Sequence, residues 1–216
     1  ANWFAPKNYQ LTESDLNRDN ILWNKNHSAP LADGRIVEKN SFRRSNYFDF
    51  VGQECRHVQS SVGILDMSAF SKASVEGSDS ETWLNSILAN KVPSKPGRIA
   101  LCHMLSLNGG VRAEFTVYRK SRNSFYLVFS GATERHDWDY LNKLLPEHGS
   151  INIQNITTQK GVFVIAGPKS RSLLQKLTDT SLDNEHFPWL TGKTVNIGYG
   201  LSLIHISEPT RLTSSA

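Results

Sequence analysis

One stretch, residues 99–118 (IALCHMLSLNGGVRAEFTVY), constrains the fold more than any other part of the chain, because it predicts a β-hairpin. Its two apolar segments flank Asn108-Gly109-Gly110, which tolerate the positive φ angles of a primed hairpin turn. After the turn, apolar and polar residues alternate, as expected of a strand with one buried face. The apolar face would carry Val111, Ala113, Phe115 and Val117, and the polar face Arg112, Glu114, Thr116 and Tyr118.

The polar face of this predicted strand places a carboxylate, Glu114, among an arginine, a threonine and a tyrosine. Glutamate is mostly a solvated surface residue, so the pattern alone favours an ordinary strand surface. A functional carboxylate is the alternative, and the residues by themselves leave both interpretations open.

The rest of the chain predicts helices and strands in an order that favours an α+β fold. Helical patterns fall at residues 48–62, 83–88 and 133–145, and strand-like runs at residues 64–68, 70–75, 125–129, 151–156 and 161–165. Ser78 or Ser80 is the expected N-cap of the second helix. Because the strands come in hairpins and short groups, we expect a mostly antiparallel sheet with flanking helices.

Charge and apolar patterning exclude two classes of partner. The net charge is +4, and no dense run of Lys and Arg with interleaved aromatic residues occurs, so we expect no nucleic-acid partner. No apolar stretch approaches the length of a membrane span, so we expect no membrane partner. The two cysteines, Cys55 and Cys102, are isolated, which is typical of buried thiols in a reducing compartment.

Searches for local catalytic motifs find none. The sequence has no Gly-rich dinucleotide fingerprint, no phosphate loop and no Gly-x-Ser-x-Gly elbow. Its seven histidines lack metal-ligand spacing, so we expect no metal site. A hydrogen-bonded structural role is the favoured interpretation of His103, and helix capping with solvation explains the charged run Glu134-Arg135-His136-Asp137.

Both ends of the chain indicate a fragment of a longer protein. The sequence begins at Ala1 without methionine, and residues 1–44 are polar with little periodicity, so we expect a connector from an upstream domain. Residues 201–211 (LSLIHISEPTR) resemble the read-through translation of a sequencing adapter. We therefore expect residues 201–216 to be a non-native tail and residues 45–200 to form the domain.

Five sequence blocks occur in an order and spacing that resemble one enzyme family. They are NYFDFVGQECRHVQSSVGILDMSAFSKASVEG, ANKVPSKPGRIALCHMLSLNGGVRAEFTVYR, FYLVFSGATERHDWDYL, VFVIAGPKSRSLL and FPWLTGK. They resemble the folate-binding portion of dimethylglycine and sarcosine dehydrogenases, which is related to the T-protein (aminomethyltransferase) of the glycine cleavage system. The resemblance covers residues 46–200, and the opening ANWFAP resembles the junction after the flavin-bearing part of those enzymes.

The resemblance implies a division of labour within a longer enzyme. An upstream flavin domain with FAD oxidises an N-methylated glycine to an iminium, and tetrahydrofolate in the downstream domain captures the one-carbon unit as 5,10-methylenetetrahydrofolate. The implied partners are this small-molecule substrate and the upstream flavin domain of the same chain. The implied localisation is the cytoplasm in bacteria or the mitochondrial matrix in eukaryotes.

The resemblance also assigns candidate site residues. The family carries an acidic residue on the strand after the glycine turn, and Glu114 occupies that position as the implied catalytic carboxylate, which would hold the folate amine and support proton transfer. Many T-proteins have aspartate there, so the carboxylate of this chain stands further from the backbone. The implied folate-binding residues are Leu101, Thr116, Tyr118, Val128, Ser130 and Phe70. Several T-proteins have asparagine in place of Ser130, which predicts a weaker or water-mediated hydrogen bond here.

Two alternatives share this architecture. The first is a glycine cleavage-type aminomethyltransferase without flavin, which the ANWFAP opening and the long connector disfavour. The second is a non-catalytic regulatory relative, like the phosphatase-regulating subunit of the same architecture. The acidic residue at position 114 favours an enzyme over that relative. Further folate contacts are expected in a block after Gly200, so we expect the fragment alone to be inactive.

Overall fold

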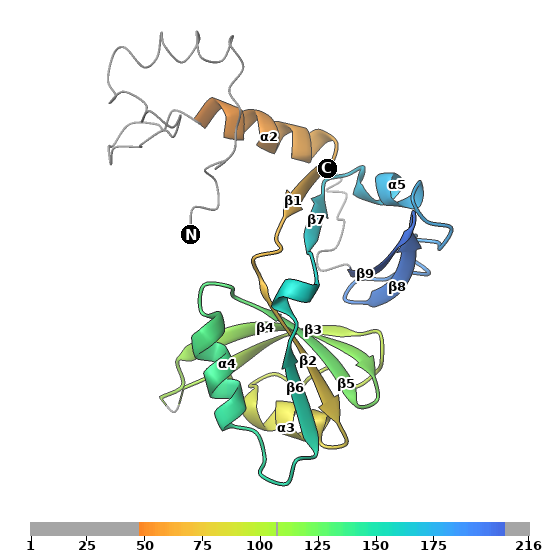
Figure 1. The fold of residues 1–216 in the computed structure, drawn as a ribbon. Coiled ribbons are helices and arrows are strands. Elements are labelled where there is room, and N and C mark those ends of the chain that lie inside the picture. Colours follow the sequence, from red (N-terminus) through yellow and green to blue (C-terminus); the bar gives the residue numbers. More distant parts are fainter. Residues whose placement is uncertain (1–47, 107, 206–216) are drawn as a thin grey trace, which may run out of the picture. The chain divides into compact units, whose positions relative to one another are not determined.

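The computed structural model describes residues 48–106 and 108–205, which form the helices and strands drawn in Figure 1. The predicted connector, residues 1–44, and the last part of the predicted tail, residues 206–216, lie outside the described residues. The chain divides into two compact units, residues 1–60 and residues 61–216.

In the first unit, helix α2 (Phe48–Ser60) forms where apolar residues recur at helical spacing. None of its residues is buried, and Cys55 is exposed. The prediction of two buried thiols is therefore wrong for Cys55, because it lies on a helix none of whose residues is buried. It is correct for Cys102 in the second unit, and burial raises the pKa of that thiol to about 11.

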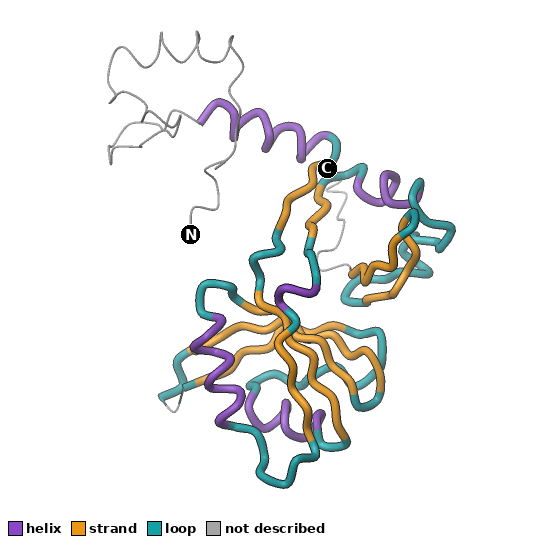
Figure 2. The backbone as a smooth tube through the Cα atoms, in the orientation of Figure 1, coloured by secondary structure: helices purple, strands orange, loops and turns teal. Residues whose placement is uncertain are grey.

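The second unit is built around a five-stranded antiparallel sheet with the strand order β3-β4-β5-β2-β6, and Figure 2 draws its strands in orange. These strands are β2 (Ser71–Gly77), β3 (Ile99–Leu105), β4 (Val111–Ser121), β5 (Ser124–Phe129) and β6 (Ile151–Asn155). Buried and accessible residues alternate along β5 and along β4 from Arg112 to Arg119, as the sequence pattern predicts. The prediction is wrong for Val111, which is 67% exposed, because the pairing of β3 with β4 shifts register at this end of the strand. The sheet therefore has two chemically different faces.

One face of the sheet packs against helices α3 (Ser80–Ile87) and α4 (Glu134–Lys143) to form the hydrophobic core (Figure 1). Phe115 of β4 and Phe129 of β5 contribute rings whose centroids lie 5.2 Å apart. Leu84 of α3 and Leu141 of α4 are fully buried in the same cluster. Burial of each such side chain stabilises the fold by about 1.5–3 kcal/mol. The alternation along the strands thus decides which face is covered and leaves the opposite face open.

The helices on the core begin differently from the prediction. Asp79 precedes α3 and Thr133 precedes α4, but neither makes a side-chain capping hydrogen bond. The hydroxyl of Ser80, a predicted cap, is buried without a hydrogen-bond partner among the described residues. Asp137 is fully buried and accepts a hydrogen bond from Thr133 Oγ1 at 2.6 Å. Capping and solvation therefore do not explain the charged run Glu134-Arg135-His136-Asp137, because its two carboxylates accept hydrogen bonds from other side chains of the fold.

The turn between β3 and β4 is longer than the predicted primed turn. Ser106 N donates to Gly110 O at 2.8 Å, and Gly109 N donates to Ser106 O at 2.9 Å. Among the described residues of the turn, Gly109 alone has a positive φ, 79°. A hairpin loop that ends in a left-handed glycine has this pattern. The strand pairing also shifts register between Met104 and Leu105, so a bulge accompanies the longer loop.

Two smaller antiparallel sheets accompany the central one in the described part of the second unit. β1 (Gly63–Asp66) pairs with β7 (Phe163–Ala166), and β8 (Gly192–Ile197) pairs with β9 (Gly200–His205). The 3-10 helix η1 (Thr157–Gln159) follows β6, and helix α5 (Ser170–Gln175) follows β7. Residues 201–205 of the predicted tail thus form a strand, and their origin stays a prediction.

The sheet of β1 and β7 carries large apolar side chains on its surface. Ile64 and Leu65 of β1 and Phe163 and Val164 of β7 are between 42% and 68% exposed. We call these four residues the apolar ladder, because Leu65 and Val164 are register partners at its centre.

Candidate functional site

The open face of the five-stranded sheet carries most of the predicted site. Leu101 of β3, Thr116 of β4 and Val128 of β5 are register partners across the three strands, and we call them the central row. Leu101 is 49% exposed, and the other two side chains are half-buried. Adjacent strands lie about 4.8 Å apart, so the row spans about 10 Å. This accessible, largely apolar surface suits contact with a flat ring system.

Glu114 lies on the same face, two residues before Thr116 on β4. Its side chain is 59% exposed, and its Oε2 lies 3.2 Å from Nε2 of His103, its register partner on β3. The other ring nitrogen, His103 Nδ1, lies 3.4 Å from Asn90 Oδ1. The sequence predicts a hydrogen-bonded histidine, and hydrogen bonding is observed. The sequence does not predict that Glu114 is the partner of His103, because this pairing depends on the register of the hairpin.

Phe70 and Ser130 lie at adjoining ends of β2 and β5, next to the central row. Ser71 and Phe129 are register partners, and the Ser71 hydroxyl donates to Ser130 O at 3.1 Å. A Cβ on Gly131 would lie 1.9 Å from a backbone oxygen of the segment before β2. The structure therefore brings the segments of Phe70 and Ser130 together in close contact.

Tyr118 lies apart from the other predicted residues. It lies four positions after Glu114 on β4, which corresponds to about 13 Å. A Cβ on Gly192 of β8 would lie 2.8 Å from the Tyr118 ring, so β8 covers this ring, and burial raises the pKa of the phenol. On the opposite side of the central row, Phe115 of β4 pairs with Phe129 of β5, and these two residues are the chain neighbours of Glu114 and Ser130. Glu114, Ser130 and Phe70 thus group on one side of the central row, and Tyr118 lies on its other side.

A buried lysine extends the central row onto β2. Lys72 is the register partner of Val128, and its side chain is fully buried. Its Nζ donates to Ser68 O at 2.9 Å and to Thr157 O at 3.0 Å. Burial lowers the pKa of Lys72, and two nearby carboxylates oppose that effect. The sequence gives no signal for this burial, because the covering segment η1 follows 85 residues later.

Glu134 ties β2, β6 and η1 together beside Lys72. Its carboxylate accepts hydrogen bonds from Asn155 Nδ2 at 2.5 Å, Ser71 Oγ at 3.0 Å and Thr157 Oγ1 at 3.2 Å. These hydrogen bonds, that from Asn155 most of all, hold the pKa of Glu134 below its usual range. The carboxylate thereby fixes the start of β2 next to the central row.

The predicted site is a surface and not an enclosed cavity. A hollow of about 440 Å³ at the end of α3 is lined by none of the predicted site residues, but Asn90 in its lining contacts His103. Its lining residues are Glu81, Asn85, Leu88, Ala89, Asn90 and Lys91. Within residues 48–106 and 108–205, no group of three or more His, Cys, Asp or Glu side chains could hold a metal ion. No helix in that part of the chain is long and apolar enough to cross a membrane.

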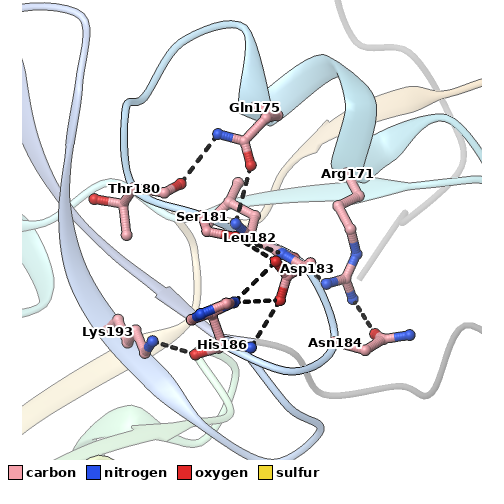
Figure 3. Close-up of polar contacts among 9 residues, drawn as sticks. All are labelled: Arg171, Gln175, Thr180, Ser181, Leu182, Asp183, Asn184, His186 and Lys193. Carbon is pink, nitrogen blue, oxygen red and sulfur yellow. Dashed lines mark hydrogen bonds and ion pairs between the residues drawn. The ribbon is translucent and has the colours of Figure 1, made fainter.

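A second polar cluster closes the loop between α5 and β8 (Figure 3). Asp183 accepts hydrogen bonds from Ser181 Oγ at 2.6 Å, from His186 N at 2.7 Å and from the His186 ring at 2.8 Å. These bonds hold the pKa of Asp183 well below its usual range. Lys193 of β8 and Arg171 of α5 donate to backbone oxygens of the same loop. Since every partner belongs to the loop or to its flanking elements, the cluster shapes the loop itself.

Comparison with known proteins assigns the chain to a family. The family model of the GCVT N-terminal domain matches residues 2–205. Mitochondrial dimethylglycine dehydrogenase of Mus musculus is 40% identical over 158 residues, which is 73% of this chain and 18% of that protein. The mitochondrial pyruvate dehydrogenase phosphatase regulatory subunit of the same species is 26% identical over 181 residues, which is 81% of this chain and 21% of that protein. The chain therefore spans about a fifth of the length of these relatives.

A solved structure shares the fold. The crystal structure of the glycine cleavage system aminomethyltransferase T from Bartonella henselae matches with a TM-score of 0.57 at 19% identity, over 65% of this chain and 37% of that chain. This likeness confirms the predicted α+β, aminomethyltransferase-like fold. The family match and the dehydrogenase relative confirm the resemblance that the five sequence blocks indicate. The chain belongs to the GCVT N-terminal domain family.

Proposed function

We propose that this chain is the tetrahydrofolate-binding part of an FAD- and tetrahydrofolate-dependent N-methylglycine dehydrogenase. The substrate of the whole protein is dimethylglycine or sarcosine, and the product is 5,10-methylenetetrahydrofolate. Residues 45–200 belong to the folate domain, residues 1–44 connect it to an upstream flavin domain, and residues 201–216 are non-native. The 40% identity to mouse mitochondrial dimethylglycine dehydrogenase supports this proposal. It also supports the mitochondrial matrix as the location in a eukaryote, with the cytoplasm as the counterpart in a bacterium.

The position of Glu114 beside the central row is the observation that carries the proposal. An accessible carboxylate next to Thr116 and Leu101 offers one strong hydrogen-bond acceptor at the edge of an apolar surface. An ionised carboxylate accepts hydrogen bonds and does not donate them, so it suits an N–H group of a ligand. Glu114 would therefore bind the folate amine and accept or return a proton there.

The described residues fit tetrahydrofolate in their surface chemistry. The half-exposed side chains of the central row offer a flat contact surface, and Phe70 and Ser130 add an aromatic ring and a hydroxyl at one end. Tetrahydrofolate, when bound, supplies the ring nitrogens that take up the one-carbon unit. Lys72 and Glu134 hold β2 in place beside this surface through partly buried hydrogen bonds.

FAD belongs to the upstream flavin domain in this proposal. The sequence of this chain has no Gly-rich dinucleotide fingerprint, so its own residues offer no cradle of that type. The contribution of the chain is therefore the folate end of the reaction.

The proposal predicts that the chain binds tetrahydrofolate and that Glu114→Ala weakens the binding. Loss of a hydrogen bond to a charged group corresponds to about tenfold or more in the dissociation constant. Isothermal titration calorimetry of tetrahydrofolate into the wild-type chain and the variant measures the change.

The matched control is Glu76→Ala. Glu76 is an exposed glutamate on β2 of the same sheet, beside Ser124 and far along the strand from the central row, so its removal should leave the affinity unchanged. Equal affinities of wild type and Glu114→Ala would remove the role of Glu114. An absence of binding in the wild type would favour the regulatory alternative, whose relative covers 81% of this chain.

A further inference from the structure

His103 holds Glu114 from the neighbouring strand. The two residues are register partners on β3 and β4, and His103 Nε2 lies 3.2 Å from Glu114 Oε2. On its other side, the ring reaches Asn90 Oδ1 with Nδ1 at 3.4 Å. The imidazole is therefore fixed between the loop after α3 and the carboxylate, and its side chain is only 32% exposed.

The contacts of the ring suit a donor role toward the carboxylate. Both ring nitrogens of His103 face oxygen atoms, and an N–H group at Nε2 would donate to Glu114 Oε2. Glu114 Oε2 is engaged in this way. The described residues place no hydrogen-bond partner on the second oxygen, Glu114 Oε1, which is thus left for a ligand.

Arg112, two residues before Glu114 on β4, is engaged elsewhere. Its Nη2 lies 2.8 Å from His136 Nε2, and its guanidinium carbon lies 3.8 Å from the centroid of the Tyr140 ring. Both partners belong to α4, so Arg112 is directed toward that helix. His103 is the basic side chain that the structure pairs with Glu114.

We propose that His103 is a positioning residue for ligand binding: it holds the Glu114 carboxylate in one orientation through Oε2 and leaves Oε1 for the N–H of the ligand. The inference deepens the proposed function and rests on it for the identity of the ligand, tetrahydrofolate. Glutamate has several rotatable bonds, so a side chain that is already held loses less freedom when the ligand binds.

A double-mutant cycle with tetrahydrofolate as the probe tests the coupling. His103→Leu should weaken binding to the 216-residue chain by about two- to fivefold, the range for a partly exposed ion pair. The same change in a Glu114→Gln background should have no further effect, because the carboxylate that His103 holds is gone. His103→Gln, whose amide can donate to Oε2, should restore most of the affinity. Additive effects of the two single changes would overturn the proposal.

A matched control separates positioning from general stability. His148 faces Asp79 at 4.0 Å in the same unit and takes no part in the site, so His148→Leu should leave the affinity unchanged. A loss in His148→Leu equal to that in His103→Leu would show a nonspecific effect and would count against the proposal.

A ligand-free measurement keeps the inference testable if the wild-type chain binds no tetrahydrofolate. The ring ¹⁵N and ¹H resonances of His103 should change in Glu114→Gln and not in Glu76→Gln, because only Glu114 faces Nε2. Unchanged His103 resonances in Glu114→Gln would refute the pairing. Changed resonances without binding would refute the proposed function alone and leave the His103–Glu114 pair established.

Discussion

At the scale of single residues, Arg119 illustrates how a charged side chain becomes part of the core side of a strand. It follows Val117 at the next alternate position of β4 and is 3% exposed. Its guanidinium donates to Glu81 Oε2 at 2.7 Å, to Pro93 O at 2.9 Å and to Arg122 O at 2.5 Å. These acceptors come from the helix α3, the loop after it and the turn after β4, so one side chain joins three segments.

Arg119→Met should lower the free energy of unfolding by about 3 kcal/mol, because methionine keeps the apolar stem but leaves buried carbonyl groups without donors. Glu81 contributes little to this loss, since it is partly exposed and water can replace its partner. Chemical denaturation monitored by circular dichroism measures the change. Arg122→Met, at an exposed position of the same turn, is the control and should be nearly neutral. Equal stabilities of wild type and Arg119→Met would contradict the structural role.

The same scale shows which site residues a sequence can reveal. Thr116 and Glu114 share a face because strand side chains alternate, and this parity is visible in the sequence. Leu101 and Val128 join them through strand pairing, which the family resemblance supplies and the alternation alone does not. Lys72 is not predictable from its own neighbours, because its cover comes from η1.

At the scale of elements, the β3–β4 hairpin is the best predicted feature and also the source of the main error. The two strands and their buried faces follow from the alternating pattern. The turn type does not follow from this pattern. A change of one residue in the length of the loop would change the partner of every residue across the two strands. The observed loop and the bulge between Met104 and Leu105 together set His103 opposite Glu114. Local sequence therefore defines the strands, and their partners depend on loop geometry.

A glycine after β5 holds the site elements close together, and its replacement should separate them. In Gly131→Ala, the new Cβ would lie 1.9 Å from Ala69 O, so the backbone before β2 must move. Overpacking of this kind costs about 1–3 kcal/mol of stability. Because Phe70 and Ser130 flank the contact, affinity for tetrahydrofolate should fall as well.

Thermal unfolding and calorimetry on Gly131→Ala measure both effects. Gly200→Ala is the matched control, since its nearest contact would be an ordinary 3.7 Å to Ile197 O. A Gly131→Ala variant with wild-type stability would show that the segment before β2 and the segment after β5 are not in close contact.

At the scale of the whole molecule, carboxylates held by hydrogen bonds couple the fold to pH, and Glu134 and Glu81 are two of them. Hydrogen bonds from Asn155, Ser71 and Thr157 hold the pKa of Glu134 below the ordinary value of 4.5, and the hydrogen bond from Arg119 does the same for Glu81. A folded-state pKa below the unfolded-state value contributes stability at higher pH. This contribution is complete above pH 4.5 and is lost as the pH falls through the lowered pKa values.

The melting temperature should therefore fall as the pH is lowered from 6 to 3, about the range in which glutamates titrate. In Glu134→Gln the acid-side decrease should be smaller, because one of the carboxylates with a lowered pKa is absent. Differential scanning calorimetry across this pH range measures the slopes. Parallel curves for wild type and Glu134→Gln would contradict the role of Glu134.

The apolar ladder of β1 and β7 has a consequence for how the chain behaves in concentrated solution. Its strands are four residues long, and each pairs with one neighbour in the described structure, so each has a free hydrogen-bonding edge. Ile64 and Phe163 keep large apolar areas in contact with water beside these edges. Two molecules that pair along these strand edges would form one continuous sheet, and the apolar side chains of both would be shielded from water. Such pairing would lower the colloidal stability of the chain, and with it the usable concentration range for calorimetry and magnetic resonance, through residues outside the candidate site.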